Sequence, residues 1–168
     1  MYCDPESVMR VSSLGAGPIG GGWTAHFLAR GYDVTAYLHD ENETDAFMSI
    51  LNTAWVSLTA LGLSPGASMD RLRIVTDLEE ALDGAEFVQE SGPERLEIKQ
   101  ALYKKMGAIL PPSVVIGSST SGLMMSDIQV DCITPERTVI GHPFNPPYLL
   151  PLVEIVGGNK TAPEAVAW

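Results

Sequence analysis

Short apolar runs alternate along this chain with segments in which apolar residues recur every three or four positions. The runs predict buried strands and the segments predict amphipathic helices, because side chains alternate on a strand and repeat about every 3.6 residues on a helix. We expect strands at 8–14, 34–38, 73–75, 86–89, 114–117, 138–141 and 152–156. We expect helices at 18–30, 43–61, 78–82, 93–109, 124–129 and, as first turns, 162–168. This alternation is typical of βαβ units, so the predicted fold class is α/β with a mostly parallel sheet.

Composition and charge narrow the possible partners. The 168 residues carry 21 acidic and 10 basic side chains, a formal net charge of −11, with no cluster of Lys or Arg. This argues against nucleic acid and anionic membranes, whose phosphates need such clusters, but not against a dinucleotide, which backbone N–H groups can hold. No apolar run reaches the roughly 20 residues that a bilayer requires. Cys3 and Cys132 form no disulfide framework and no secretory leader is apparent, so we expect a cytoplasmic protein.

A glycine-rich turn lies between the first predicted strand and the first predicted helix. Gly15 would permit a tight turn, Gly17 would let the backbone approach a pyrophosphate, and Gly20 would allow close contact between helix and strand. The helix N-terminus would face the phosphates with the positive end of its dipole. We therefore predict a doubly wound, Rossmann-type domain that binds NAD, and a glycine turn without a ligand is the less favoured alternative. The predicted contacts are Gly15, Gly17, Pro18, Ile19 and Gly20.

The acidic residue that usually holds the adenosine ribose is missing from its expected position. That position, at the end of the second strand, holds Leu38. Asp40 is the nearest carboxylate, and we predict that it binds the cofactor, with a solvated turn residue as the alternative. No arginine is nearby to bind a 2′-phosphate, so NAD is favoured over NADP.

Three polar residues in the last third of the chain have the types needed to handle a proton. His142 follows a predicted strand, and Glu154 lies twelve positions later, after a segment with four prolines that would prevent a helix. A carboxylate on one imidazole nitrogen fixes the tautomer and stabilises the imidazolium formed when the other nitrogen takes a proton. Ser121 lies in a predicted turn between a strand and a helix. A serine hydrolase is the competing interpretation, but Ser121 lacks the Gly-x-Ser-x-Gly elbow. No metal site is predicted.

Four stretches of the sequence resemble the 3-hydroxyacyl-CoA dehydrogenase family, and the resemblance extends over nearly the whole chain. The resemblance is carried by the glycine turn, by Gln-Glu-Ser-Gly-Pro-Glu at 89–94, by Ser-Ser-Thr-Ser at 118–121 and by Gly-His-Pro-Phe-Asn-Pro at 141–146. Within the family, the stretches 61–68, 89–95 and 142–154 are most similar to L-carnitine dehydrogenases. The L-gulonate 3-dehydrogenase branch shares the His-Pro-x-Asn-Pro-Pro-Tyr pattern.

The resemblance implies a role for each matching residue. His142 would be the base, Glu154 its orienting acid, and Ser121 the hydroxyl that contacts the substrate and the nicotinamide. It adds three cofactor contacts, which are Asn145, Glu94 and Lys99.

The resemblance also implies an activity and a larger protein. The family has an all-helical C-terminal domain that closes the substrate cleft and forms the dimer, so residues 1–168 would be the NAD-binding Rossmann domain, truncated before it. We expect the full-length homodimer to oxidise a 3-hydroxy group on a short-chain substrate with NAD, and the 168-residue chain alone to be inactive. L-Carnitine, giving 3-dehydrocarnitine, is favoured, and 3-hydroxybutyryl-CoA and L-gulonate are the alternatives. A non-catalytic NAD-binding module is an alternative of another class.

Overall fold

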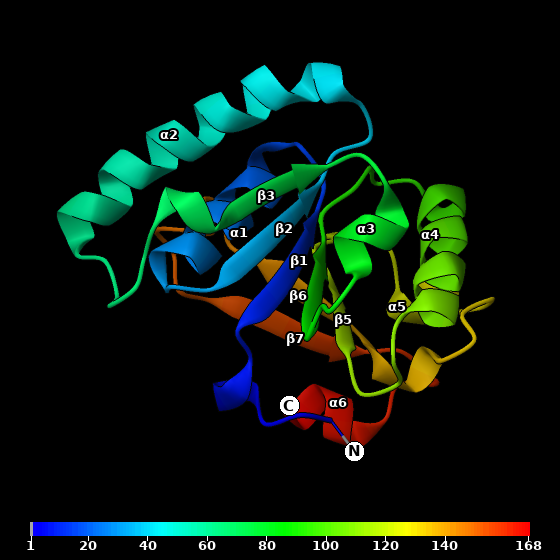
Figure 1. Ribbon diagram of the computed structural model, residues 1–168. Helices are drawn as coiled ribbons and strands as arrows, with labels where there is room; N and C mark the ends of the chain where they lie inside the picture. Colours follow the sequence, from blue (N-terminus) through cyan, green and yellow to red (C-terminus); the bar gives the residue numbers. More distant parts are fainter. Residues whose placement is uncertain (1) are drawn as a thin grey trace.

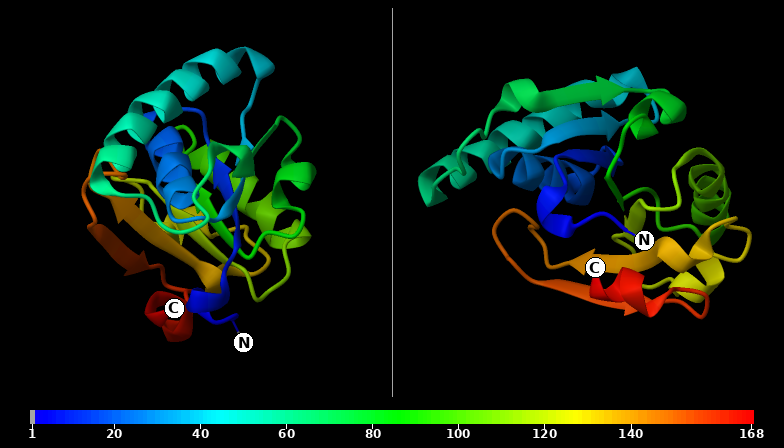
Figure 2. Two further views of the ribbon diagram at one scale, coloured as in Figure 1. Left: turned by 60° about the vertical axis from the view of Figure 1, so that its left-hand side comes forward. Right: turned by 60° about the horizontal axis from the view of Figure 1, so that its bottom comes forward.

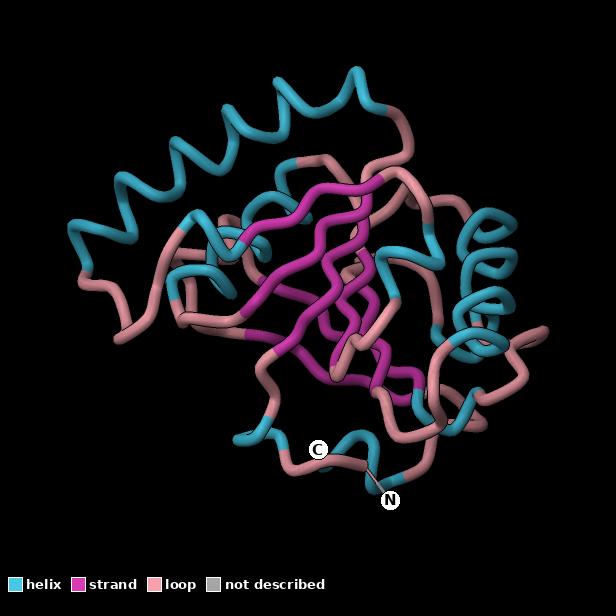
Figure 3. The backbone as a smooth tube through the Cα atoms, viewed as in Figure 1, coloured by secondary structure: helices cyan, strands magenta, loops and turns pink. Residues whose placement is uncertain are grey.

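Seven strands form one sheet that separates two groups of helices (Figures 1 and 3). The computed structural model describes residues 2–168. The strand order is β3-β2-β1-β4-β5-β6-β7, in which β1 to β6 pair in parallel and β7 runs antiparallel to β6. The strands are β1 Arg10–Leu14, β2 Asp33–Tyr37, β3 Leu72–Val75, β4 Phe87–Glu90, β5 Val115–Ser118, β6 Thr138–Pro143 and β7 Val153–Gly157. The predicted Rossmann-type, doubly wound and mostly parallel fold is confirmed.

Helices cover both faces of this sheet (Figure 2). Helices α1 and α2 pack on one face, and α3, α4 and α5 pack on the other. The helices are α1 Pro18–Ala29, α2 Thr44–Leu61, α3 Leu78–Leu82, α4 Leu96–Ile109, α5 Met125–Ile128 and α6 Pro163–Ala167. Short 3₁₀ turns occur at Pro5–Ser7, Glu41–Glu43, Met69–Arg71 and Pro135–Arg137. Within residues 2–168, no helix is both long and apolar enough to cross a membrane.

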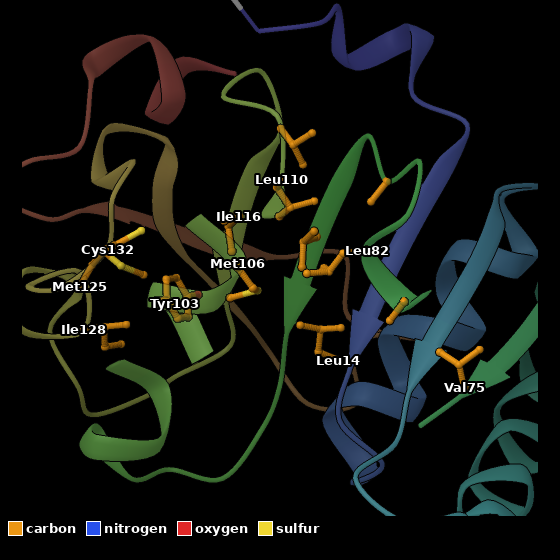
Figure 4. Close-up of a cluster of buried hydrophobic side chains, with 14 residues drawn as sticks. Leu14, Val75, Leu82, Tyr103, Met106, Leu110, Ile116, Met125, Ile128 and Cys132 are labelled. Atoms are coloured by element: carbon orange, nitrogen blue, oxygen red, sulfur yellow. The ribbon is translucent and has the colours of Figure 1, made fainter. Parts of the chain in front are cut away.

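Each face of the sheet has its own apolar core. On the α1–α2 side, Leu28, Phe47 and Leu51 are fully buried together. On the other side, Tyr103 and Met106 of α4 pack against strand and loop side chains (Figure 4). Burying such a side chain contributes about 1.5–3 kcal/mol, so both layers hold the sheet firmly and fix the positions at which its strands end.

The strand order reverses direction at the centre of the sheet. The chain builds β1, β2 and β3 toward one edge and then returns to place β4 on the other side of β1. The loops that follow β1 and β4 therefore diverge, and ligands of open α/β sheets bind in the crevice between such loops. The glycine turn follows β1 directly, so it lies at this crevice.

One predicted helix start is wrong. We expected a helix from residue 93, with Pro93 in the first turn, but α4 begins at Leu96. The Arg95 N–H donates to the Pro93 carbonyl in a tight turn, and Arg95 itself is extended. Glu94 reaches from this turn to the loop after β5, a contact that a helical start would not make. The other predicted boundaries lie within two residues of those observed.

The two ends of the described chain lie beside each other (Figures 1 and 2). The Trp168 indole N–H donates to the Cys3 carbonyl, and the Tyr2 hydroxyl donates to the Glu136 carbonyl. These contacts lie at the opposite end of the sheet strands from the glycine turn, so they brace the fold away from the crevice.

Candidate functional site

The glycine turn has the geometry of a cradle with one open side. Gly15 has φ +123°, and a Cβ there would lie 2.5 Å from the Ser91 carbonyl oxygen. A Cβ on Gly20 would lie 2.1 Å from the Gly15 carbonyl oxygen, so these two positions are closed by backbone. Gly17 is the N-cap of α1, yet a Cβ there would meet nothing within 4 Å, and no side chain among residues 2–168 caps the helix. The N–H groups of the first helical turn are thus available to an anion such as a pyrophosphate.

The end of β2 is bonded to the glycine turn but carries no acidic side chain of its own. The Gly15 N–H donates to the Tyr37 carbonyl over 3.0 Å. Leu38 comes next and is fully buried in the α1–α2 core, so it faces away from a ligand. Asp40 is exposed and serves as the N-cap of the Glu41–Glu43 turn, where its Oδ1 accepts from the Asn42 N–H and the Asn42 side-chain amide. Its role toward the ribose stays a prediction, since only Oδ1 makes these bonds.

The structure brings His142 and Glu154 together. The antiparallel register of β6 and β7 pairs these two residues directly, and the His142 Nδ1 lies 2.8 Å from the Glu154 Oε2. The side chains are 31% and 58% exposed, so both remain open to a ligand. With Nδ1–H donated to the carboxylate, Nε2 carries the free lone pair that accepts a proton.

One cavity is shared by His142 and the glycine turn. It has a volume of about 350 Å³. Ile19 of the glycine turn contributes to its wall, as do Ser121 and His142. These three residues lie far apart in the sequence and meet because each follows the carboxyl end of a strand or lies near it. The full lining is Ile19, Ser119, Ser121, His142, Pro143, Phe144 and Asn145.

Glu94 holds the turn that carries Ser121. Its Oε1 accepts from the backbone N–H groups of Ser121 and Gly122, both over 3.0 Å, and from the Thr120 hydroxyl. Burial raises the pKa of Glu94, but the hydrogen bonds from Thr120, Gly122 and Ser121 and the charge of Lys99 outweigh it, so the pKa is lowered. The Ser121 side chain is exposed at the cavity.

Lys99 lies beneath this turn and not on the cavity wall. Its side chain is 1% exposed, and its Nζ donates to both oxygens of Glu90, over 2.8 and 3.0 Å. Lys99 therefore faces the interior, where its Nζ also donates to the Gly92 carbonyl over 3.5 Å, and the Glu94 Oε2 at 3.8 Å connects it to the Ser121 turn.

Sequence reasoning missed three polar residues at this end of the sheet. Glu90 is the buried partner of Lys99, and Gln89 donates to the Ser119 hydroxyl over 2.7 Å and to the Gly141 carbonyl over 3.1 Å. Ser119 itself lines the cavity. A signal was present, since polar side chains at the end of a strand buried on both faces are unusual. Residues 2–168 contain no group of three or more His, Cys, Asp or Glu that could hold a metal ion.

Comparison with known proteins agrees with this geometry. Residues 10–168 match the family profile described as "3-hydroxyacyl-CoA dehydrogenase, NAD binding domain". The chain belongs to the 3-hydroxyacyl-CoA dehydrogenase family. The resemblance found in the sequence is thereby confirmed, and the domain binds NAD.

Relatives in this family include enzymes of known name. The chain is 56% identical over 164 residues to an L-carnitine dehydrogenase of Streptomyces coelicolor, covering 98% of this chain and 52% of that protein. It is 50% identical over 155 residues to an L-carnitine dehydrogenase of Pseudomonas putida, covering 92% and 48%. The 3-hydroxybutyryl-CoA dehydrogenase of Escherichia coli K12 superposes with a TM-score of 0.87 at 30% identity, covering 96% of this chain and 35% of that one. The chain thus spans about half the length of the curated relatives that it matches.

A matched pair of glycine variants tests the cradle. Gly17→Ala should leave the thermal stability of this family member nearly unchanged, because its Cβ meets no protein atom, yet should weaken NAD binding about tenfold or more by occupying the open side. Gly20→Ala should lower the free energy of unfolding by about 1–3 kcal/mol, because its Cβ overlaps the Gly15 carbonyl. Thermal unfolding and NADH fluorescence titration measure both effects. Unaltered NAD affinity in Gly17→Ala would contradict the cradle.

The predicted ribose contact of Asp40 can be separated from its capping role. Asn caps helical turns as well as Asp does, so Asp40→Asn should keep the melting temperature. Loss of the carboxylate should raise the Kd for NAD about tenfold, as expected for a hydrogen bond to a charged group. Glu41→Gln makes the same change of charge next to it and serves as the control. If both variants bind NAD like the unmodified protein, Asp40 is only a cap.

The lowered pKa of Glu94 predicts how the Ser121 turn responds to acid. Because the folded-state pKa lies below the unfolded value, the stabilisation is complete above the unfolded pKa and is lost as the pH falls through the folded pKa. The backbone amide shifts of Ser121 and Gly122, followed by NMR, should therefore titrate with a midpoint below 4.5, the ordinary value. A midpoint at or above 4.5 would show that these hydrogen bonds do not hold the turn.

Proposed function

We propose that the full-length protein oxidises the 3-hydroxy group of a short-chain substrate with NAD, and that L-carnitine, giving 3-dehydrocarnitine, is the favoured substrate. The observation that carries this proposal is the shared cavity, which has Ile19 of the glycine turn on one side and His142 on the other. The bond from His142 to Glu154 supports it, since it leaves Nε2 free to act as a base. The relatives named L-carnitine dehydrogenase support the choice of substrate.

Different residues of this chain have different roles in the proposed reaction. NAD, when bound, supplies the hydride acceptor. Glu154 holds the imidazole through Nδ1–H, so that Nε2 takes the proton of the substrate hydroxyl as the carbon–hydrogen bond breaks. The Glu154 carboxylate then stabilises the imidazolium. Ser121 donates or accepts at the substrate oxygen and fixes its direction toward Nε2. Such positioning is the main contribution expected of the site.

Several residues would hold the cofactor. Gly15, Gly17 and Gly20 would form the pyrophosphate cradle, with Pro18 and Ile19 opening the helix above it. Asp40 would bind the adenosine ribose through its second carboxylate oxygen. Asn145 would contact the nicotinamide ribose from the cavity wall, and Glu94 would contact the cofactor beside the Ser121 turn. Lys99 would act on the cofactor through Glu94, since its own ammonium is enclosed.

We also propose how this domain sits in the whole protein. Residues 1–168 would form the NAD-binding domain of a cytoplasmic homodimer, joined to a helical C-terminal domain that closes the substrate cleft. The free cysteines Cys3 and Cys132 agree with a reducing compartment. The 168 residues alone would bind NAD weakly and turn over no substrate.

The base is tested by replacing His142 in the full-length protein. His142→Ala should lower kcat about 100- to 10,000-fold while the Kd for NAD stays within about threefold, because the imidazole handles only the proton. Glu154→Gln should lower kcat less, since the amide still holds the ring but does not stabilise the imidazolium. Steady-state kinetics and NADH titration measure these quantities. If NAD affinity falls as much as kcat, His142 is not the base.

The substrate is tested with a panel of L-carnitine, 3-hydroxybutyryl-CoA and L-gulonate in the presence of NAD. We expect the highest kcat/KM with L-carnitine. A higher value with either of the others would transfer the assignment to that substrate. No activity with all three, together with retained NAD binding, would favour a non-catalytic NAD-binding module, the alternative supported by Leu38 at the ribose position.

A further inference from the structure

A fully buried carboxylate lies at the end of β4, just outside the cavity wall. The Glu90 side chain is 0% exposed and accepts four hydrogen bonds. Two come from the Lys99 ammonium, one from the Ser118 hydroxyl over 2.7 Å, and one from the Gly92 N–H over 2.6 Å. Four donors and no acceptor around the two oxygens are the surroundings of an ionised carboxylate.

These bonds tie together the segments that surround Ser121. Lys99 belongs to α4, Ser118 ends β5, and Gly92 lies in the loop between β4 and α4. The Glu90 carbonyl also accepts from the Ser119 N–H over 2.7 Å, so its backbone and its side chain both hold the start of the Ser121 turn. Glu90 therefore bonds directly to the β4 loop, to α4 and to the end of β5.

Lys99 is shared between two carboxylates of different exposure. Its main partner is the buried Glu90, and its second is the Glu94 Oε2 at 3.8 Å, on a side chain that is 45% exposed. Glu94 uses its other oxygen, Oε1, for the backbone N–H groups of Ser121 and Gly122. The contacts thus run from Glu90 to Lys99, from Lys99 to Glu94, and from Glu94 to the Ser121 turn.

We propose that Glu90 is a positioning residue for Ser121, acting through Lys99 and Glu94. This inference rests on the proposed function, in which Ser121 fixes the substrate oxygen. Glu90 itself touches neither the cavity nor the reacting atoms.

The physical reason is the cost of an unpaired charge in the interior. Without the Glu90 carboxylate, the buried Lys99 ammonium loses its main charged partner, which is strongly destabilising. The closest remaining anion is Glu94, and Lys99 would draw it inward by up to about 1 Å to reach hydrogen-bonding distance. Glu94 would then leave the N–H groups of Ser121 and Gly122, and the turn would lose the bonds that fix it.

Two isosteric variants at opposite ends of β4 test this inference in the full-length protein. Glu90→Gln removes the buried charge next to the site. Glu86→Gln is the control, because the Glu86 carboxylate accepts two backbone N–H bonds and pairs with an arginine, but lies just before the other end of β4 and is partly exposed. We expect Glu90→Gln to increase amide hydrogen exchange at residues 120–122 about tenfold, the loss of about one hydrogen bond, and to lower kcat at least as much. Glu86→Gln should change neither.

A double-mutant cycle separates positioning from general destabilisation. If Glu90 acts through Glu94, then Glu94→Gln added to Glu90→Gln should lower kcat by less than about threefold further, well short of its effect alone. Additive losses would overturn the proposal, as would normal exchange at 120–122 in a folded Glu90→Gln variant.

A third variant applies if Glu90→Gln fails to fold. Glu90→Gln combined with Lys99→Met removes both buried charges and should restore folding. The proposal then predicts that exchange at 120–122 returns to within about threefold of the unmodified protein, because no ammonium remains to draw Glu94 off the N–H groups of Ser121 and Gly122. Exchange that stays fast in this folded double variant would overturn it. The exchange measurement needs no substrate. Fast exchange in a folded Glu90→Gln variant, of a protein that oxidises none of the substrates, would therefore support the positioning contacts while showing that the proposed function has failed.

Discussion

The parallel pairing of six strands places their carboxyl ends along one edge of the sheet, and every residue of the proposed site depends on that constraint. The glycine turn follows β1, Glu90 ends β4, the Ser121 turn follows β5, and His142 lies near the end of β6. Only Glu154 approaches from elsewhere. It reaches His142 because β7 runs antiparallel to β6, so that β7 begins at this edge with Glu154 opposite His142. The reversal of strand order next to β1 then opens the crevice into which these loops project.

Polar groups at this edge are held in place by other polar groups from a neighbouring loop. Glu94 holds the Ser121 turn, Gln89 holds Ser119, and Glu154 holds His142. Such pairs fix side-chain directions better than apolar contacts do, because hydrogen bonds are directional. The buried pair of Glu90 and Lys99 extends this pattern inward. Its desolvation makes it a poor source of stability, so its value lies in the geometry that it imposes.

Much of the architecture could be predicted because its signals are local. Periodicity located the strands and α-helices, though not the short 3₁₀ turns, and the glycine spacing located the turn between β1 and α1. The approach of Glu154 to His142 could also be expected, since prolines exclude a helix between them and leave a returning strand. The failures came from competing contacts. Pro93 favours a helix start, but Glu94 is needed by the Ser121 turn, so α4 begins later.

The features of the site that could not be predicted from the sequence depend on tertiary contacts and on local capping. The pairing of Lys99 with Glu90 depends on how α4 packs over the end of β4, which no spacing rule states. Asp40 caps the Glu41–Glu43 turn, and its ribose contact is a prediction. An aspartate suits a cap and a ribose contact equally, so its residue type alone does not distinguish the two roles. At the position where the ribose-binding acid is usually found, Leu38 belongs to the apolar core of the α1–α2 side.

A crystal structure of the full-length protein with NAD tests the central claim most directly. The account predicts a pyrophosphate at the N-terminus of α1 over Gly17, and a nicotinamide ring inside the cavity, in contact with Ile19 and facing His142 and Ser121. A nicotinamide ring bound outside this cavity, or a His142 separated from Glu154 in the complex, would contradict it.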